Sequence, residues 1–183
     1  GRRQAAIVAA VVARLSTVIA LLRGSLIEKH PSRVVIDVGG VGYDVQVPLS
    51  TFYGLGEPGA TVVLRIHTHV REDLIALYGF STMLEQDLFE RLIAISGIGP
   101  KLGLAVLSGI EPADLIRAIR TQDVARLTKI PGVGKKTAER IGLELKDRLP
   151  QVAMLAAEPA PGTGRPEDQL RDDLLSALVN LGY

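Results

Sequence analysis

Two short segments combine glycines and lysines in a way that suits phosphate binding. Gly97 to Lys101 and Gly132 to Lys136 both read glycine, apolar residue, glycine, any residue, lysine, at an offset of 35 residues. Glycines one residue apart permit a tight turn and let the backbone approach a ligand closely. If a helix begins after each turn, its free amide groups and positive dipole end favour a phosphate.

The repeat predicts two helix-hairpin-helix motifs, which hold nucleic-acid backbones without reading bases. We expect the apolar residue between the glycines, Ile98 or Val133, to pack inward and anchor each turn. Lys101 in the first copy, and Lys135 and Lys136 in the second, would supply counter-charge. The alternative, that both turns only connect helices tightly, stays open.

The second segment also looks like part of a nucleotide-binding P-loop, but it does not fit that motif. Lys129 stands where the motif needs glycine, and Lys136 stands where it needs serine or threonine. We also expect a helix before Gly132, where the motif needs a strand. The sequence therefore predicts no ATPase site here.

A second polar cluster, Arg71-Glu72-Asp73, falls between two expected strands. Adjacent carboxylates at a hairpin tip are usually a solvated turn, but on a DNA-binding surface they would repel phosphates. His67 and His69 lie just upstream, on one face of the expected strand. A metal there would need a third ligand from Glu72 or Asp73, and ordinary strand histidines are commoner. We predict no metal and no cofactor.

The first part of the chain has the sequence signals of a small β-barrel. The Val41 to Val47 segment alternates, which predicts that Val41, Tyr43, Val45 and Val47 share one face. Gly39-Gly40 suits a two-residue hairpin connection. We expect strands at 19–29, 33–38, 41–47, 61–70 and 74–78, with a turn-rich connection over 48–59. Five short strands favour an OB-fold barrel.

After Gly79 the apolar spacing becomes helical. Leu84, Leu88, Leu92 and Ile95 recur at three- and four-residue intervals, and Gly97 ends that helix. Further helices are expected to begin at Pro100, Pro112, Thr121 and about Lys135, the last running to Arg148. The predicted fold class is α+β, with an OB-fold barrel followed by a tandem helix-hairpin-helix domain.

The predicted domain organisation has five parts. They are an extra N-terminal arm at 1–17, the barrel at 18–81, the helix-hairpin-helix domain at 82–150, a flexible linker at 151–166 and an incomplete C-terminal helical domain at 167–183. Arg2 and Arg3 precede an apolar run, Ala5 to Ala13, that is too short to span a bilayer. We expect a cytoplasmic protein without a membrane segment.

Composition narrows the classes of function. The chain of 183 residues has no cysteine, which excludes a disulfide framework and a thiolate metal site. Aromatic residues make up only 4%, which argues against a site built on several stacked rings. Net charge is +1, but residues 126–148 carry seven Lys or Arg against three acids. A polyanion would meet this basic segment first.

Residues 18–150 resemble the RuvA family, the branch-migration subunits that bind Holliday junctions. The matching stretches are Leu22-Arg23-Gly24, Gly39-Gly40-Val41-Gly42-Tyr43, Ser50-Thr51-Phe52-Tyr53, Arg71-Glu72-Asp73, Leu77-Tyr78-Gly79-Phe80, Gly99-Pro100-Lys101 and Pro131 to Arg140. Leu178 to Tyr183 is similar to the end of the first helix of the family's third domain. Residues 1–17 lie outside the family pattern, and the sequence stops at Tyr183 after one helix of the third domain. If Tyr183 is the natural end, motor binding is in doubt, whereas junction binding is not.

The resemblance implies a non-catalytic subunit whose tetramer, alone or face to face with a second one as an octamer, surrounds a four-way DNA junction. Glu72 and Asp73 would form the family's acidic pin at the crossover. The family works with a hexameric ATPase, RuvB, and a junction-resolving nuclease, RuvC, in recombination and repair. The implied DNA-binding residues are Gly97, Ile98, Gly99, Pro100, Lys101, Gly132, Val133, Gly134, Lys135, Lys136, Thr137 and Arg140.

Two other classes of DNA-binding protein fit the sequence less well. A helix-hairpin-helix DNA glycosylase needs a base pocket and a catalytic aspartate, and Asp147 and the linker acids, the nearby carboxylates, do not suit such a pocket. A general single-strand-binding OB module needs several exposed rings. The barrel offers only Tyr43, Phe52, Tyr53 and Tyr78 before Phe80, and alternation places Tyr43 in the core.

Overall fold

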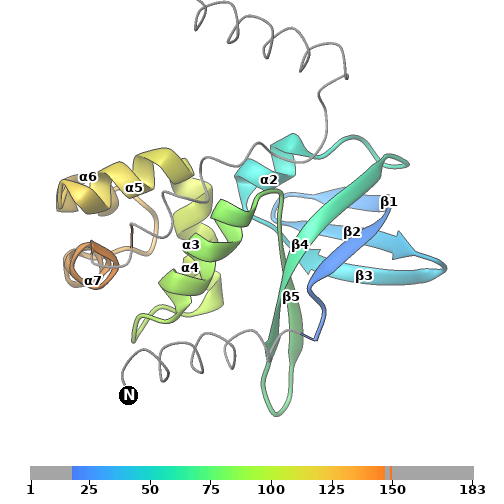
Figure 1. Ribbon diagram of the computed structural model, residues 1–183, viewed down its shortest axis with the longest axis horizontal. Helices are drawn as coiled ribbons and strands as arrows, with labels where there is room; N and C mark the ends of the chain where they lie inside the picture. The colour runs from blue at the N-terminus through green and yellow to red at the C-terminus, as the bar shows by residue number, and fades with distance from the viewer. Residues whose placement is uncertain (1–17, 147–148, 150–183) are drawn as a thin grey trace, which may run out of the picture.

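The computed structural model describes residues 18–146 and Leu149, and the structural statements below concern that part of the chain. The predicted arm at 1–17, the linker at 151–166 and the tail at 167–183 lie outside the described residues. A β-barrel forms one side of the molecule and a group of helices the other (Figure 1). Within the described part, no helix has the length and apolar character needed to cross a membrane.

The barrel confirms the predicted five-stranded OB-fold. Its strands are β1 (Leu21–His30), β2 (Arg33–Val38), β3 (Val41–Gln46), β4 (Thr61–Val70) and β5 (Ile75–Phe80). They close in the order β1-β2-β3-β5-β4, and every pair is antiparallel except β3 with β5. A bulge between Leu26 and Glu28 bends β1, which helps a short sheet to close on itself.

The β2–β3 hairpin has the predicted turn, but the first residue of β3 is not buried as predicted. Gly39 and Gly40 have φ of 65° and 92°, the positive values that the tight hairpin turn requires. Val45 and Val47 are buried and Tyr43 packs against the barrel core. Val41 was expected beside them, but it is 54% exposed, because it directly follows the turn at the open end of the ribbon.

The connection from β3 to β4 was predicted to be turn-rich, but its first part is helical. It contains the short helix α2 (Leu49–Gly54), which follows Pro48 and buries Thr51. Six residues are too few to show an apolar periodicity, so the sequence pattern could not reveal this helix. Its first turn faces the start of α3, as described below.

The helical part contains α3 (Met83–Ile93), α4 (Pro100–Gly109), α5 (Pro112–Arg120), α6 (Val124–Leu127) and α7 (Lys135–Lys146). The helix expected from Thr121 instead begins at Val124. Asp123 is its N-cap and accepts a hydrogen bond from the Arg126 amide at 2.9 Å. Thr121 ends α5, where its hydroxyl donates to the Arg117 carbonyl at 3.0 Å.

β5 belongs to two hydrophobic cores at once. Leu77 points into the barrel core, whereas Ala76, Tyr78 and Phe80 pack with the helices. Phe89 of α3 lies against both aromatic rings, with centroid distances of 5.1 Å to Tyr78 and 4.9 Å to Phe80. The barrel and the helical part therefore share a continuous apolar interface along this strand.

Candidate nucleic-acid interface

The two glycine-rich turns have the same backbone hydrogen bonds. In the first turn the Ile98 amide donates to the Ile95 carbonyl, and in the second the Val133 amide donates to the Ile130 carbonyl, both at 3.0 Å. At the start of the following helix, the Gly103 amide donates to Gly99 and the Ala138 amide to Gly134, both at 2.9 Å. The residues that make these hydrogen bonds in the second turn are each 35 residues after their counterparts in the first, as the sequence repeat predicts.

The first glycine of each turn needs its backbone freedom. Gly97 has φ of 88° and Gly132 has φ of 84°, a region that residues with a Cβ adopt only with strain. Ile98 and Val133 follow them and are 4% and 5% exposed. The prediction that this apolar residue packs inward is confirmed, so each turn is anchored while its glycines stay at the surface.

The two turns lie beside each other. A Cβ added to Gly97 would lie 3.8 Å from Nη1 of Arg140 in α7. A Cβ added to Gly132 would lie 3.2 Å from Cδ1 of Leu102 in α4. Each turn thus lies close to the helix that follows the other turn, which places the predicted residue Arg140 near the first turn.

The helix starts combine free amides with exposed cations. The first-turn amides that α4 leaves without a helical partner belong to Lys101 and Leu102, because Pro100 has no N–H. In α7 they belong to Lys135, Lys136 and Thr137. All three lysines are exposed. The arrangement can hold phosphate groups through backbone amides supported by lysine charge.

Glu72 and Asp73 form the tip of the β4–β5 hairpin, away from these turns along the chain. Arg71 and Leu74 exchange backbone hydrogen bonds of 2.8 and 3.4 Å, so Glu72 and Asp73 are the two loop residues. Both side chains are exposed. In Figure 1 this hairpin extends downward, beyond the other strands of the barrel. The sequence prediction of an acidic hairpin tip is confirmed in position.

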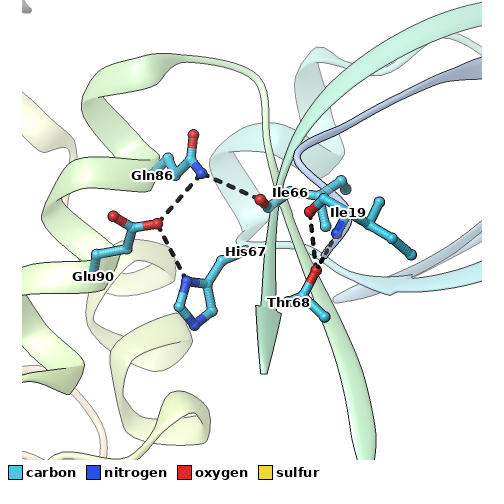
Figure 2. Close-up of polar contacts among 6 residues, drawn as sticks. All are labelled: Ile19, Ile66, His67, Thr68, Gln86 and Glu90. Atoms are coloured by element: carbon cyan, nitrogen blue, oxygen red, sulfur yellow. Dashed lines mark hydrogen bonds and ion pairs between the residues drawn. The ribbon is translucent and has the colours of Figure 1, made fainter. Parts of the chain in front are cut away.

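His67 and His69 lie on one face of β4 but have ordinary partners. Nδ1 of His67 lies 3.2 Å from Oε1 of Glu90 in α3 (Figure 2), and the Arg71 Nε–H donates to Nε2 of His69 at 3.1 Å. Partial burial and the neighbouring Arg71 lower the pKa of His69. Among the described residues, no three histidine or acidic side chains come together as a metal site.

The barrel rings that could stack on bases are mostly occupied. Tyr78 is only 6% exposed and lies against Phe89, and burial raises its pKa. Phe52 is partly buried against the barrel core, with the Lys29 ammonium 5.0 Å from its centroid. Within residues 18–146, Tyr53 is the ring with high exposure, at 76%. Asp147, weighed above as a glycosylase residue, lies outside the described residues.

Glu85 is a buried polar residue that the sequence analysis did not single out. Its carboxylate accepts from the backbone amide of Thr82 at 3.2 Å, and the Thr82 hydroxyl accepts from the Glu85 amide at 3.1 Å. The spacing Thr82-x-x-Glu85 is that of a capping box, so the signal was present. That spacing alone would not reveal the partners in α2 that are described below.

Comparison with known proteins adds the family. Residues 19–79 match the RuvA N-terminal domain, and residues 89–147 match a tandem SAM-like helix-hairpin-helix. The chain is 56% identical over 164 residues to the Holliday junction branch migration complex subunit RuvA of Solibacter usitatus, covering 90% of this chain and 82% of that protein. The chain belongs to the RuvA family. The RuvA proteins of Geobacter sulfurreducens and Syntrophobacter fumaroxidans are 52% and 55% identical to it, covering 90% and 88% of this chain and 83% and 81% of those proteins.

The two matched regions coincide with the two parts of the structure. The first covers most of the barrel, including the acidic turn, and the second begins at Phe89 and includes both glycine turns. The family resemblance drawn from the sequence is therefore confirmed, as is the α+β fold class with its barrel and paired helical hairpins.

Proposed function

We propose that this chain is a non-catalytic subunit that binds four-way DNA junctions for branch migration. The observation that carries the proposal is the combination, in one chain, of two neighbouring helix starts with free amides and exposed lysines and a separate acidic hairpin tip. The relatives named above are called subunits of a Holliday junction branch migration complex, and this supports the same reading.

In this proposal the two hairpins hold a duplex arm by its backbone near the minor groove. The amides and lysines at the starts of α4 and α7 contact phosphates, and Arg140 adds a cation between the two turns. The proposed DNA-binding set is the one given above, from Gly97 to Lys101, from Gly132 to Thr137, and Arg140. Since these groups contact the backbone, sequence preference would be weak.

The acidic tip carries negative charge, unlike the two hairpins, and we place it at the junction crossover and not on the duplex arms. Glu72 and Asp73 cannot hold phosphates, because like charges repel. At the crossover, however, that repulsion would keep the exchanging strands apart. Their exposure at the end of an extended hairpin supports this role as the acidic pin.

The assembly and partners belong to the same proposal. Four barrels, residues 18–81, would surround the crossover as a homotetramer, and residues 82–150 would hold the arms; two such tetramers face to face would form an octamer. The hexameric ATPase RuvB would supply the motor, with the region at 167–183 as its contact, and the nuclease RuvC would resolve the junction. The proposal places this work in recombination and repair in the cytoplasm.

A competition gel shift tests the function directly. The protein is bound to a labelled synthetic four-way junction and challenged with unlabelled junction or with linear duplex of the same sequence. The proposal predicts that the junction competes at a far lower concentration than the duplex. Equal competition by the two DNAs would overturn it and leave the hairpins as general duplex-binding elements.

The acidic pin has its own prediction. Changing Glu72→Gln together with Asp73→Asn removes both charges with little change in shape, so junction affinity stays the same or increases. Strand separation at the crossover, followed with a fluorescent base analogue placed there, should decrease. A matched control changes two other exposed barrel acids, Glu28→Gln and Glu57→Gln. Loss of junction binding in the pin variant alone would contradict the assignment.

A further inference from the structure

The barrel and the helical part are joined by a buried carboxylate. Glu85 of α3 is 4% exposed and accepts hydrogen bonds from both sides of the joint. From α2 come the hydroxyls of Ser50 at 2.5 Å and Thr51 at 3.1 Å. From the β5–α3 connection come the amides of Ser81 at 3.1 Å and Thr82 at 3.2 Å. This set of contacts is called the Glu85 joint below.

The negative charge of Glu85 is balanced by donors, not by a cation. None of the ion pairs in the described part of the chain includes Glu85. Its position in the first turn of α3 also places it at the positive end of the helix dipole. A buried carboxylate is tolerated only when its hydrogen bonds are well made, so the joint favours a single geometry.

Two other polar contacts link the barrel and α3, one of them part-buried and one exposed. The Gln86 side-chain amide donates to the Ile66 carbonyl at 3.2 Å, and Glu90 lies beside His67 (Figure 2). The Glu90 side chain is 44% exposed, so water can replace its contact at low cost. The Glu85 carboxylate is instead buried, with its contacts buried or part-buried, at the point where β5 passes into α3.

The joint lies between the two proposed DNA-contacting regions along the chain. β5 leads back to the acidic pin, and α3 leads forward to the first hairpin. With its 11 residues, α3 is about 16 Å long, so a rotation of about 10° at its start moves its far end by about 3 Å. That displacement is as long as a hydrogen bond to a phosphate. A loose joint would therefore shift the two hairpins relative to the acidic pin, so that both could not reach their places on one junction.

We infer that Glu85 is a positioning residue that sets the angle between the barrel with its pin and the two hairpins, and thereby the preference for a four-way junction over linear duplex. The inference rests on the proposed junction-binding function. A linear duplex needs only the hairpins, whereas a junction needs the hairpins and the pin in register. Loosening the joint should therefore affect junction affinity much more than duplex affinity.

The test compares Glu85→Gln with Asp87→Asn in the full chain. Asp87 is an acidic residue of the same helix, but it pairs with Arg91 within α3 at 2.6 Å and not with the barrel. Glu85→Gln should lower the ratio of junction to duplex affinity by about tenfold, with duplex affinity within about twofold of the parent. Asp87→Asn should leave the ratio unchanged. Equal losses of both affinities, or an unchanged ratio, would overturn the inference.

A milder variant and a direct readout of geometry accompany this test. Ser50→Ala removes one donor to Glu85 and should lower the ratio in the same direction by a smaller factor; if Glu85→Gln does not fold, an unchanged ratio in Ser50→Ala overturns the inference. Because the chain has no cysteine, dyes can be attached at Val41→Cys and Ala125→Cys, with labelled subunits diluted by unlabelled ones.

Energy transfer between these dyes reports the angle without DNA. The distance distribution should broaden in Glu85→Gln and Ser50→Ala and stay narrow in Asp87→Asn. A narrow distribution in all variants would overturn the inference even if binding changed. If the parent protein showed no junction preference, the proposed function would fail on its own, and the dye distances would still report whether Glu85 holds the joint.

Discussion

The first hairpin, Gly97 to Lys101, and the second, Gly132 to Lys136, have matching hydrogen bonds but different sets of phosphate donors. The start of α4 offers two free amides and Lys101, because Pro100 has no backbone N–H to donate. The start of α7 offers three free amides, Lys135 and Lys136. The comparison separates two properties of the site: the backbone geometry that both copies share, and the charge that only the second copy concentrates.

The second hairpin should therefore carry more of the affinity for DNA. Changing Lys135→Gln together with Lys136→Gln removes two cations and is expected to weaken duplex binding by roughly thirtyfold, at about 1 kcal/mol for each contact. Fluorescence anisotropy with a labelled duplex measures this. The control, Lys146→Gln, removes a cation from the far end of α7 and should change affinity by less than about twofold.

Substitution of the first glycine should also have the larger effect in the second turn, here on the free energy of unfolding. Gly97→Ala and Gly132→Ala both force a side chain into a left-handed conformation, at about 1–2 kcal/mol. Gly132→Ala should lower the free energy of unfolding further, because its Cβ also meets Leu102 Cδ1 at 3.2 Å, whereas Gly97 has its nearest neighbour at 3.8 Å. Urea unfolding gives both values, and a larger loss for Gly97→Ala would contradict this ranking.

The first hairpin should show a smaller effect of charge. Lys101→Gln removes one cation and is expected to weaken duplex binding by about fivefold. Measured in the same anisotropy assay, this loss should be clearly below that of the Lys135 and Lys136 double variant. If Lys101→Gln costs as much as the double variant, the two hairpins do not divide the affinity by their charge.

The second glycine of each turn should separate binding from stability. Gly99 has an ordinary φ of −88°, and a Cβ at Gly99 or Gly134 would meet nothing within 4 Å. Gly99→Ala and Gly134→Ala should therefore lose less stability than Gly97→Ala or Gly132→Ala, yet weaken duplex binding by about threefold, because the new methyl group stands between the backbone and the phosphate. Unchanged binding in both variants would contradict a close approach of the phosphate to the backbone at Gly99 and Gly134.

How far the sequence predicted this molecule depended on whether a feature was local. The glycine turns, the Gly39-Gly40 hairpin and the strand alternation, apart from Val41, are set by neighbouring residues, and they were predicted. Helix α2 was missed because it is short and because its Ser50 and Thr51 bond to the distant residue Glu85. The helix expected from Thr121 begins at Val124 instead, because Asp123 is the residue that caps it.

The candidate site shows the same division. Each hairpin could be predicted, because the spacing of its glycines and lysine lies within a single short segment. Their proximity, with Arg140 near Gly97 and Leu102 near Gly132, depends on how the helices pack. The partners of Glu85 in α2 lie 34 and 35 residues away in sequence, so the capping-box spacing revealed only half of that joint.

The measurement that tests the central claim most directly is the salt dependence of duplex affinity. If the hairpins hold phosphates together, log affinity should fall linearly with log salt, by about 0.9 for each phosphate contacted. The slope should decrease by about 2 in the Lys135 and Lys136 double variant and by about 1 in Lys101→Gln. A flat salt dependence in the parent, or equal slopes in all three proteins, would contradict a phosphate-holding role for the two hairpins.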